Sequence, residues 1–269
     1  NSEFYRLACT FYVSPGNERT YVVLSGLNEN MPAAMQLFEK LLADAQVNKE
    51  AYDNLVGDIL KARADAKLNQ GQNFSRLMNY AMYGPKSPAT NLLTEAELAS
   101  MNPQELVDRI HNQNNYKHRI LYYGPSSSKD LLATIDQYHQ VPATLKDIPA
   151  GNEFSYLETP ATKVLVAPYE AKQIYMAQIS NLDKKYDPAI EPTRELYNEY
   201  FGGGMNTIVF QEMREARGLA YSAWANLAIP TNAKGDYYYM AFIATQNDKM
   251  QKAIEAFDEI INNMPESEA

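Results

Sequence analysis

The sequence predicts an α+β fold built from two homologous units, and three observations lead to this prediction. Near both ends of the chain, two strand-like segments around a turn are followed by an amphipathic helix. Most segments between them have apolar residues at helical spacing. Hydrophobic residues make up 45% and charged residues 21% of the 269 positions, which is typical of globular protein with a sizeable core.

The two ends of the chain match each other when the sequence is shifted by 219 positions. The matches fall in the turn, at the start of the helix and in its core, which indicates one architecture used twice. Residues 1–50 then overlay residues 220–269. We therefore interpret residues 1–140 as the later part of one repeat and residues 163–269 as the earlier part of the next, joined by a proline-containing linker over residues 141–162. The coincident pairs are Gly16 and Gly235, Asn28 and Asn247, Met31 and Met250, Ala34 and Ala253, and Phe38 and Phe257.

Local patterns predict the elements of the first part of the chain. Residues 4–13 and 19–27 are expected to form a hairpin around a turn at residues 14–18. A further strand is expected over residues 119–124, and Gly71 is expected to end the long second helix. The helices are predicted over residues 30–45, 48–69, 74–83, 102–111 and 126–139, with a short one opening at Thr94 and a cap at Asn102.

The second part of the chain repeats the alternation of strands and helices. A turn is expected at residues 230–235, before the last strand. The strands are predicted over residues 163–168, 173–179, 221–227 and 236–244, and the helices over residues 188–200, 205–217 and 248–262.

Charge and composition exclude several classes of protein. A net charge of −9 is opposite in sign to that of most nucleic-acid-binding proteins. No apolar run approaches the ~18 residues that a membrane span needs. The single cysteine, Cys9, allows no internal disulfide bond, so cytoplasm and periplasm both stay open. Because the chain begins with Asn1 and its first residues already resemble a strand, we expect it to be a piece of a longer polypeptide.

The most specific pattern is FGGGMNTIVFQEMREARGLAYS, over residues 201–222. Its glycine run cannot lie inside a helix, an amphipathic helix follows, and Gly218 then occupies the place of a helix C-cap. Arg214 thus ends a helix and Tyr221 begins a strand, so a cation and a phenol are brought close together. A plainer interpretation, in which Arg214 is a solvated helix-end cation and Tyr221 a half-buried strand residue, stays open.

This stretch resembles the second half of the pitrilysin/insulinase family of zinc peptidases, the inverted HxxEH enzymes. In that family the non-catalytic half supplies an arginine and a tyrosine at this spacing, which reach the substrate held at the zinc of the other half. By this resemblance, Arg214 and Tyr221 have catalytic and substrate-binding roles, and Gly203 and Gly204 belong to the substrate-binding site. The resemblance also implies tandem α+β domains, each an antiparallel sheet with helices on one face.

The zinc ligands of that family are not found in this sequence. No HxxEH occurs, and we interpret the three histidines, His111, His118 and His139, as surface or helix-end residues. The segment EAYDNLVGDILKARAD resembles the family helix that carries the third ligand, but its Asp53 and Asp58 are interpreted as solvated helix charges. The resemblance therefore implies a zinc cofactor bound outside this chain, and the chain alone is expected to be inactive.

The expected function is the non-catalytic, substrate-binding half of a zinc-dependent endopeptidase that degrades peptides. Its partners would be a peptide substrate and the HxxEH-bearing half, in the same polypeptide or in a partner subunit. Arg214 would hydrogen-bond a substrate carbonyl, and Tyr221 would donate its hydroxyl to the oxyanion of the transition state. Two alternatives stay open: a catalytically silent scaffold or binding subunit of the same fold, and an unrelated peptide- or glycan-binding α+β module.

Overall fold

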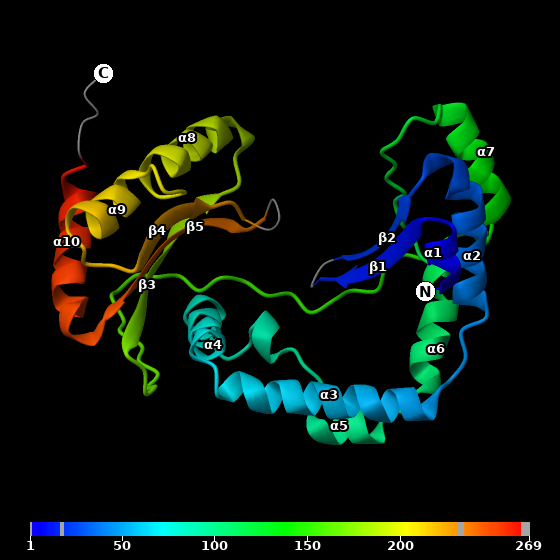
Figure 1. Cartoon of the computed structure of the whole chain (residues 1–269), viewed down its shortest axis with the longest axis horizontal. Coiled ribbons are helices and arrows are strands. Elements are labelled where there is room, and N and C mark those ends of the chain that lie inside the picture. Colours follow the sequence, from blue (N-terminus) through cyan, green and yellow to red (C-terminus); the bar gives the residue numbers. More distant parts are fainter. Residues whose placement is uncertain (1, 17–18, 231–233, 265–269) are drawn as a thin grey trace. The chain divides into compact units, whose positions relative to one another are not determined.

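A computed structural model describes residues 2–16, 19–230 and 234–264 of the chain (Figure 1). The described residues form helices and two antiparallel sheets, so the predicted α+β class is confirmed. No helix in these ranges is both long and apolar enough to cross a membrane.

The chain divides into two compact units, and each unit contains residues from two separate parts of the sequence. The first unit comprises Asn1–Ala62 and Leu93–Glu153, and the second comprises Arg63–Leu92 and Phe154–Ala269. The division into two homologous repeats with a linker at residues 141–162 stays a prediction.

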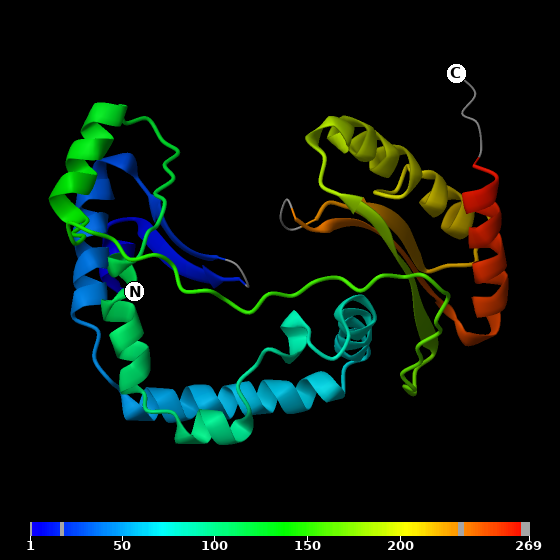
Figure 2. The same ribbon diagram turned by 180° about the vertical axis from the view of Figure 1, so that it is seen from behind.

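The first unit is organised around the predicted hairpin. Strands β1 and β2 pair antiparallel, and Cys9 lies opposite Gly26. Phe4, Cys9 and Ala34 form a small core with partly buried neighbours, including Phe11 and Phe38, whose rings are 5.8 Å apart. Figure 2 shows this unit from behind, with α2 and α7 side by side next to the hairpin. Its elements are α1 (Ser2–Arg6), β1 (Cys9–Pro15), β2 (Thr20–Gly26), η1 (Asn28–Asn30), α2 (Met31–Ala43), α5 (Glu95–Ser100), α6 (Gln104–His111), η3 (Gln113–Asn115) and α7 (Ser128–Tyr138).

Two short helices of this unit begin where the sequence predicts. Thr94 caps α5, since its hydroxyl accepts from the backbone N–H of Glu97 while that glutamate accepts from the N–H of Thr94. These bonds from Thr94 lower the pKa of Glu97 below its usual range. At α6, the Asn102 side chain accepts from the N–H of Gln104 at 3.0 Å. Helix α3 (Lys49–Lys67) begins in the first unit and ends in the second.

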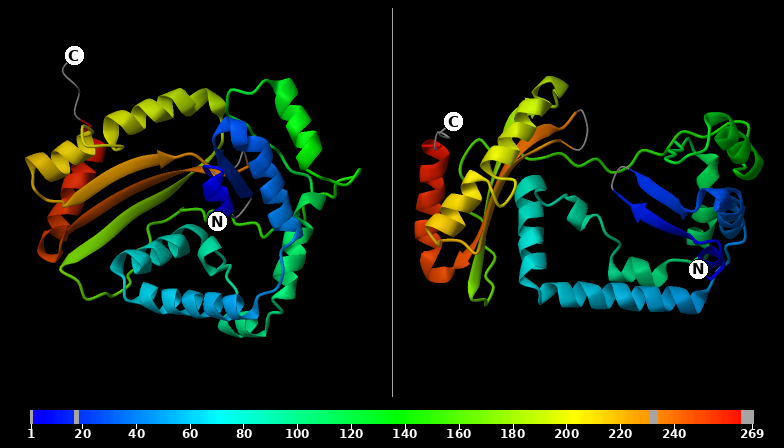
Figure 3. Two further views of the ribbon diagram at one scale, coloured as in Figure 1. Left: turned by 45° about the vertical axis from the view of Figure 1, so that its right-hand side comes forward. Right: turned by 45° about the horizontal axis from the view of Figure 1, so that its top comes forward.

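The second unit is built on a three-stranded antiparallel sheet in the order β3-β5-β4. Val209, Met213 and Phe257 join sheet residues in a core on one face of this sheet, while Phe74 of α4 packs edge-on against Phe242 on the other face (Figure 3). The elements are α4 (Gln70–Tyr83), η2 (Pro88–Thr90), β3 (Gln173–Lys185), η4 (Pro188–Ile190), α8 (Glu191–Phe201), α9 (Ile208–Phe210), the π-helix η5 (Gln211–Ala216), β4 (Ser222–Ala228), β5 (Asp236–Gln246), η6 (Asn247–Lys249) and α10 (Met250–Asn262).

The shift of 219 positions relates the elements that follow β2 and β5. A 3₁₀ turn and a helix of 13 residues begin at Asn28 and Met31 in the first unit, and at Asn247 and Met250 in the second. Strands β2 and β5 keep this offset, whereas β1 and β4, the first strands of the two hairpins, follow a different one. Ser25 pairs with Thr10, whereas its counterpart Ala244 pairs with Ser222, and 222 − 10 = 212.

The register therefore corrects part of the predicted overlay. The connection between the strands is seven residues longer in the second hairpin, since 219 − 212 = 7. Tyr221, which precedes Ser222, consequently corresponds to Cys9 and not to Ser2. The end of the overlay, residues 265–269, lies outside the described residues.

Three predicted strand segments and one predicted boundary are wrong. Residues 4–6 belong to helix α1, because a helical turn buries Phe4 against Phe11, with ring centres 4.8 Å apart. Residues 119–124 and 163–168 belong to no strand, because a strand needs a neighbour to accept its backbone hydrogen bonds and neither segment has one among the residues described. The long helix ends before Gly71, which lies in the first turn of α4.

The two predicted turns lie partly outside the described residues. Of the first turn, Ser14 and Pro15 belong to β1, and residues 17–18 are not described. Of the second, residues 231–233 are not described.

Candidate functional site

The glycine run lies where α8 meets the edge strand β4. The N–H of Ala225 donates to the carbonyl of Gly202 at 3.2 Å, and a Cβ at Gly202 would lie 2.3 Å from the carbonyl oxygen of Ala225. Gly203 donates to the carbonyl of Asn198 at 2.6 Å, and its Cβ would come within 2.8 Å of that oxygen. A Cβ at Gly204 would meet open space. Gly202, which the sequence analysis did not single out, is thus the glycine that packing requires most.

The outer edge of β4 is occupied by side chains of α8. The Asn198 side chain accepts from the N–H of Leu227 at 2.8 Å and donates to its carbonyl at 3.1 Å, as a neighbouring strand would do. Arg194 donates to the same carbonyl at 3.0 Å and to Glu191 at 2.9 Å. A hydrogen bond from Tyr237, together with Arg194, holds the pKa of Glu191 below its usual range. A cleft of about 600 Å³ remains here, lined by Gly203, Trp224 and others.

The chain reverses sharply between Arg214 and Tyr221. The N–H of Arg217 donates to the carbonyl of Glu212, the wide i→i−5 pattern of a π-helix, which is frequent at functional sites. Gly218 then takes φ +57°, the left-handed conformation predicted for a helix C-cap. The carbonyl of Met213 accepts from the N–H of Leu219 and from that of Ala220, at 2.9 and 3.1 Å. Met213 and Ala220 are thus hydrogen-bonded to each other, and Arg214 and Tyr221 are the residues that directly follow them.

Arg214 is the less firmly held of the two arginines in this turn. Its side chain is 47% exposed, its Nε lies 3.6 Å from Glu215, and its guanidinium lies 5.0 Å from the ring centre of Phe210. Arg217 instead contacts Glu259 of α10 at 2.6 Å and Glu212 at 3.4 Å. The bond from Arg217 lowers the pKa of Glu259, so this ion pair ties the π-helix to α10. The side chain of Arg214 is thus more exposed and more weakly paired than that of Arg217.

The side chain of Tyr221 is exposed, unlike those of several residues in strand β4, which it precedes. Its side chain is 72% exposed, although its N–H donates to the carbonyl of Ala244 at 2.8 Å. Ala223 and Ala225, two and four positions further along, are buried. The plainer interpretation of Tyr221 as a half-buried residue is therefore wrong. Among the residues that line the cleft beside β4 are Gly203 and Trp224, and Tyr221 is not one of them.

The three histidines are placed differently from one another. His111 is exposed at the end of α6, as predicted, with Nε2 2.9 Å from the carbonyl of Ala45. His139 is only 14% exposed, because its Nδ1 contacts Glu39 at 2.6 Å and its Nε2 contacts His118 at 2.8 Å. His139 lies at the end of α7, which agrees with the interpretation as a surface or helix-end residue. Its partners come from segments too distant in sequence for a motif to reveal.

The described residues do not provide a family-type zinc site. Within residues 2–16, 19–230 and 234–264, no group of three or more His, Cys, Asp or Glu side chains is placed to hold a metal ion. Asp53 is 57% exposed and pairs with Lys49, and Asp58 is exposed, so both are solvated helix charges as predicted.

The family is identified by comparison with known proteins. Residues 119–268 match the family model described as "Peptidase M16 inactive domain", so the chain belongs to the M16 peptidase family. The matched range includes the glycine run, Arg214 and Tyr221. No curated protein matches the sequence significantly.

Solved structures of this family share the fold at low sequence identity. The M16 inactive domain from Pseudomonas fluorescens has a TM-score of 0.59 at 16% identity, over 98% of this chain and 65% of that one. The periplasmic protease PqqL from Escherichia coli has a TM-score of 0.70 at 16% identity, over 99% and 30%. The ferredoxin protease FusC, solved in complex with Arabidopsis ferredoxin, has a TM-score of 0.68 at 11% identity, over 98% and 29%. The chain thus spans about two thirds of the first protein and less than a third of the other two.

Proposed function

We propose that this chain is part of the non-catalytic, substrate-binding half of a zinc-dependent endopeptidase that degrades peptides. Membership in a family whose matching domain is described as inactive supports a role beside the catalytic centre. The likeness of the fold to a protease solved with a bound protein supports a polypeptide as the ligand. Zinc belongs, in this proposal, to the HxxEH-bearing half, in the same polypeptide or in a partner subunit.

The observation that carries the proposal is the presentation of Arg214 and Tyr221. The doubly hydrogen-bonded carbonyl of Met213 holds the two backbones together, while both side chains extend into solvent. An exposed aromatic next to a weakly paired arginine contributes little to folding. The same arrangement is suited to contacts with a ligand, because arginine and tyrosine provide strong hydrogen-bond donors together with a large contact area.

The two side chains would have different roles toward a peptide substrate. Arg214 is always charged and offers planar paired donors, so it would bind and orient a substrate carbonyl. Tyr221 would donate its hydroxyl to the oxyanion that develops on the scissile carbonyl, and a positioned donor of this kind lowers the barrier mainly in the transition state. Gly203 and Gly204 would leave room for the substrate backbone at the end of α8, since neither carries a side chain.

The matched pair Arg214→Lys and Arg217→Lys tests this division of roles in the complete peptidase. Arg214→Lys should lower kcat/KM by about 10- to 100-fold without changing the melting temperature, because a lysine cannot reproduce a two-donor contact. Arg217→Lys should lower the melting temperature and leave kcat near the wild-type value, since Arg217 binds Glu259 and Glu212.

Unchanged kcat/KM for Arg214→Lys would contradict the proposed contact with substrate. A complete wild-type protein that binds peptides but cleaves none would favour the alternative, a catalytically silent binding subunit of the same fold.

A further inference from the structure

A chain of hydrogen bonds crosses the first unit through two histidines, and the proposed function does not use it. Nδ1 of His118 lies 2.7 Å from the carbonyl oxygen of Tyr116, and the Nε2 atoms of His118 and His139 are 2.8 Å apart. Nδ1 of His139 lies 2.6 Å from Oε1 of Glu39, whose Oε2 accepts from Asn114 at 2.9 Å. We call Glu39, His118 and His139 the histidine latch.

The partners of the two rings fix how many protons the latch holds. A backbone carbonyl only accepts, so Nδ1 of His118 must carry a hydrogen. The carboxylate of Glu39 likewise accepts, so Nδ1 of His139 must carry one. The two Nε2 atoms that face each other then need one hydrogen between them, because two lone pairs or two N–H groups at 2.8 Å would repel. Three protons on two imidazoles give the histidines one positive charge, next to the negative charge of Glu39.

The same atoms fit a proton better than a metal ion. Zinc–nitrogen bonds of about 2.0–2.1 Å in a tetrahedral site would hold two ligand nitrogens more than about 3 Å apart. The Nε2 atoms are closer than this, at the length of a nitrogen–nitrogen hydrogen bond. Among the residues that the structure describes, no group of three or more His, Cys, Asp or Glu side chains is placed to hold a metal ion, and this includes Glu39 with the two histidines.

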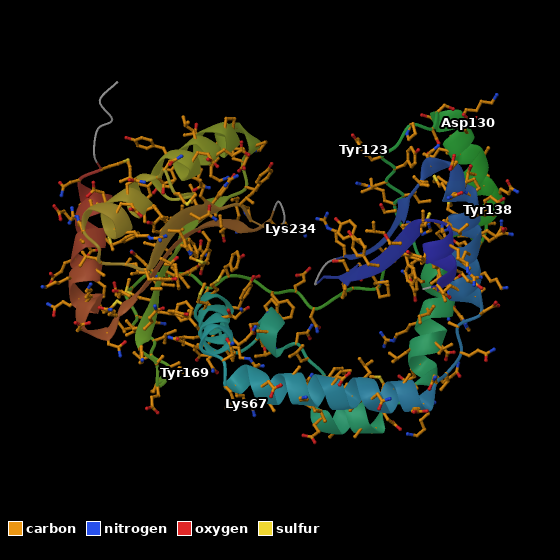
Figure 4. All side chains as sticks on the ribbon, in the orientation of Figure 1. Lys67, Tyr123, Asp130, Tyr138, Tyr169 and Lys234 are labelled. Carbon is orange, nitrogen blue, oxygen red and sulfur yellow. The ribbon has the colours of Figure 1, made fainter. Side chains whose placement is uncertain are left out.

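The latch connects three segments that are distant in sequence. Glu39 lies on α2, His139 directly follows α7, and His118 lies in the extended segment before α7. Figure 4 labels Asp130 and Tyr138 on α7 and Tyr123 in the extended segment. Close to the latch, Lys117 and Asp147 form an exposed ion pair at 2.6 Å.

A second tether holds the same extended segment and carries no histidine. The hydroxyl of Tyr122 and that of Ser126 both donate to the side chain of Asn28, at 2.8 and 2.9 Å. This tether consists of hydroxyl and amide groups only, which makes it a control for the latch.

We propose that the histidine latch is a pH-sensitive device, which fixes residues 116–127 to α7 and α2 only while the two histidines share a single proton. As pH falls, a second Nε2 becomes protonated and two N–H groups face each other, so the bond between the rings breaks. As pH rises, the shared proton is lost and Glu39 faces a neutral ring. The latch is therefore strongest in a window at intermediate pH, and it weakens on both sides of this window.

Ring-nitrogen NMR of the whole chain tests the proton count. Within the window, we expect His139 to carry both ring hydrogens and His118 to carry one, on Nδ1. Two neutral rings or two independently titrating rings across this range would overturn the proposal. So would stoichiometric zinc binding at neutral pH that displaces the shared proton, because the site would then be a metal site.

Hydrogen exchange of residues 116–140, corrected for intrinsic rates and followed from pH 4.5 to 8.5, tests the latch itself. Protection of the wild type should pass through a maximum, and His139→Gln should lower that maximum about tenfold and abolish the pH dependence. Tyr122→Phe should lower protection by a similar factor at every pH, and His111→Gln should change nothing. A wild-type pH profile retained by His139→Gln would overturn the proposal.

Discussion

The hairpins β1–β2 and β4–β5 share one plan but differ at the residue that lies at the start of the first strand. In the first hairpin this residue is Cys9, which is 4% exposed and donates its thiol to the carbonyl of Leu7. In the second it is Tyr221, which is 72% exposed. In the first, two residues separate helix and strand, and in the second, residues 217–221 do. The longer connection allows Tyr221 to turn toward solvent.

This difference shows that the plan shared by the two hairpins does not require an exposed tyrosine at this position. The plan of strand, strand, 3₁₀ turn and helix is satisfied in the first unit by a small buried side chain. The first unit therefore has Cys9, and no tyrosine, at the position that corresponds to Tyr221. The exposed side chain of Tyr221 is therefore compatible with the proposed contact to a ligand.

The largest effect on stability is expected at the glycine that the second unit needs for packing. Gly202→Ala would place a Cβ 2.3 Å from the backbone of β4, which cannot move without disturbing the sheet. We expect a loss of about 2–3 kcal/mol in the free energy of unfolding, measured by urea denaturation. The control is Gly204→Ala, whose Cβ meets open space and should change stability by less than about 0.5 kcal/mol. Equal effects of the two substitutions would contradict the packing of α8 on β4.

The comparison of the two hairpins predicts opposite sensitivities at corresponding positions. Cys9→Ala should cost about 1 kcal/mol, because it leaves a small cavity beside Phe4 and removes the bond to Leu7. Tyr221→Ser should change stability by less than about 0.5 kcal/mol, because the side chain is mostly in water. Both values come from urea denaturation at neutral pH. A cost at Tyr221 equal to or above that at Cys9 would break the comparison.

A smaller, pH-dependent effect is expected at the ion pair that holds the π-helix. Arg217 lowers the pKa of Glu259 in the folded chain, so this carboxylate adds stability above the usual glutamate pKa of about 4.3. That contribution is lost as pH falls through the lowered pKa. Glu259→Gln should therefore be less stable than the wild type at pH 7, and the difference should disappear in acid. A difference that persists unchanged at pH 3 would show that the charge of Glu259 is not responsible.

Much of the fold could be predicted because the relevant signals are local. The amphipathic pattern over residues 248–262 predicts α10 (Met250–Asn262) to within two residues. Gly218 could be placed at a helix end because only glycine adopts its positive φ without strain. Arg214 and Tyr221 could be singled out because one tight turn fixes their backbones relative to each other.

The remaining features depend on partners that are distant in sequence. Residues 119–124 have the composition of a strand, but no neighbouring strand pairs with them among the described residues. The need for Gly202 arises only where α8 approaches β4, and the bond between His118 and His139 arises only in the folded unit. Spacing along the chain cannot reveal contacts of this kind, because they are set by tertiary packing.

The most direct test of the account is the kinetic effect of Tyr221→Phe in the complete enzyme of the proposed function, with the HxxEH-bearing half present in the same polypeptide or as a partner subunit. The substitution removes one exposed hydroxyl, so kcat should fall by about 10²–10³-fold while KM and the melting temperature stay nearly constant. The control, Tyr123→Phe, alters a fully exposed tyrosine of the first unit and should change nothing. A wild-type kcat for Tyr221→Phe would contradict the account, and so would a lower melting temperature with a proportionate loss of activity, because Tyr221 would then act through folding.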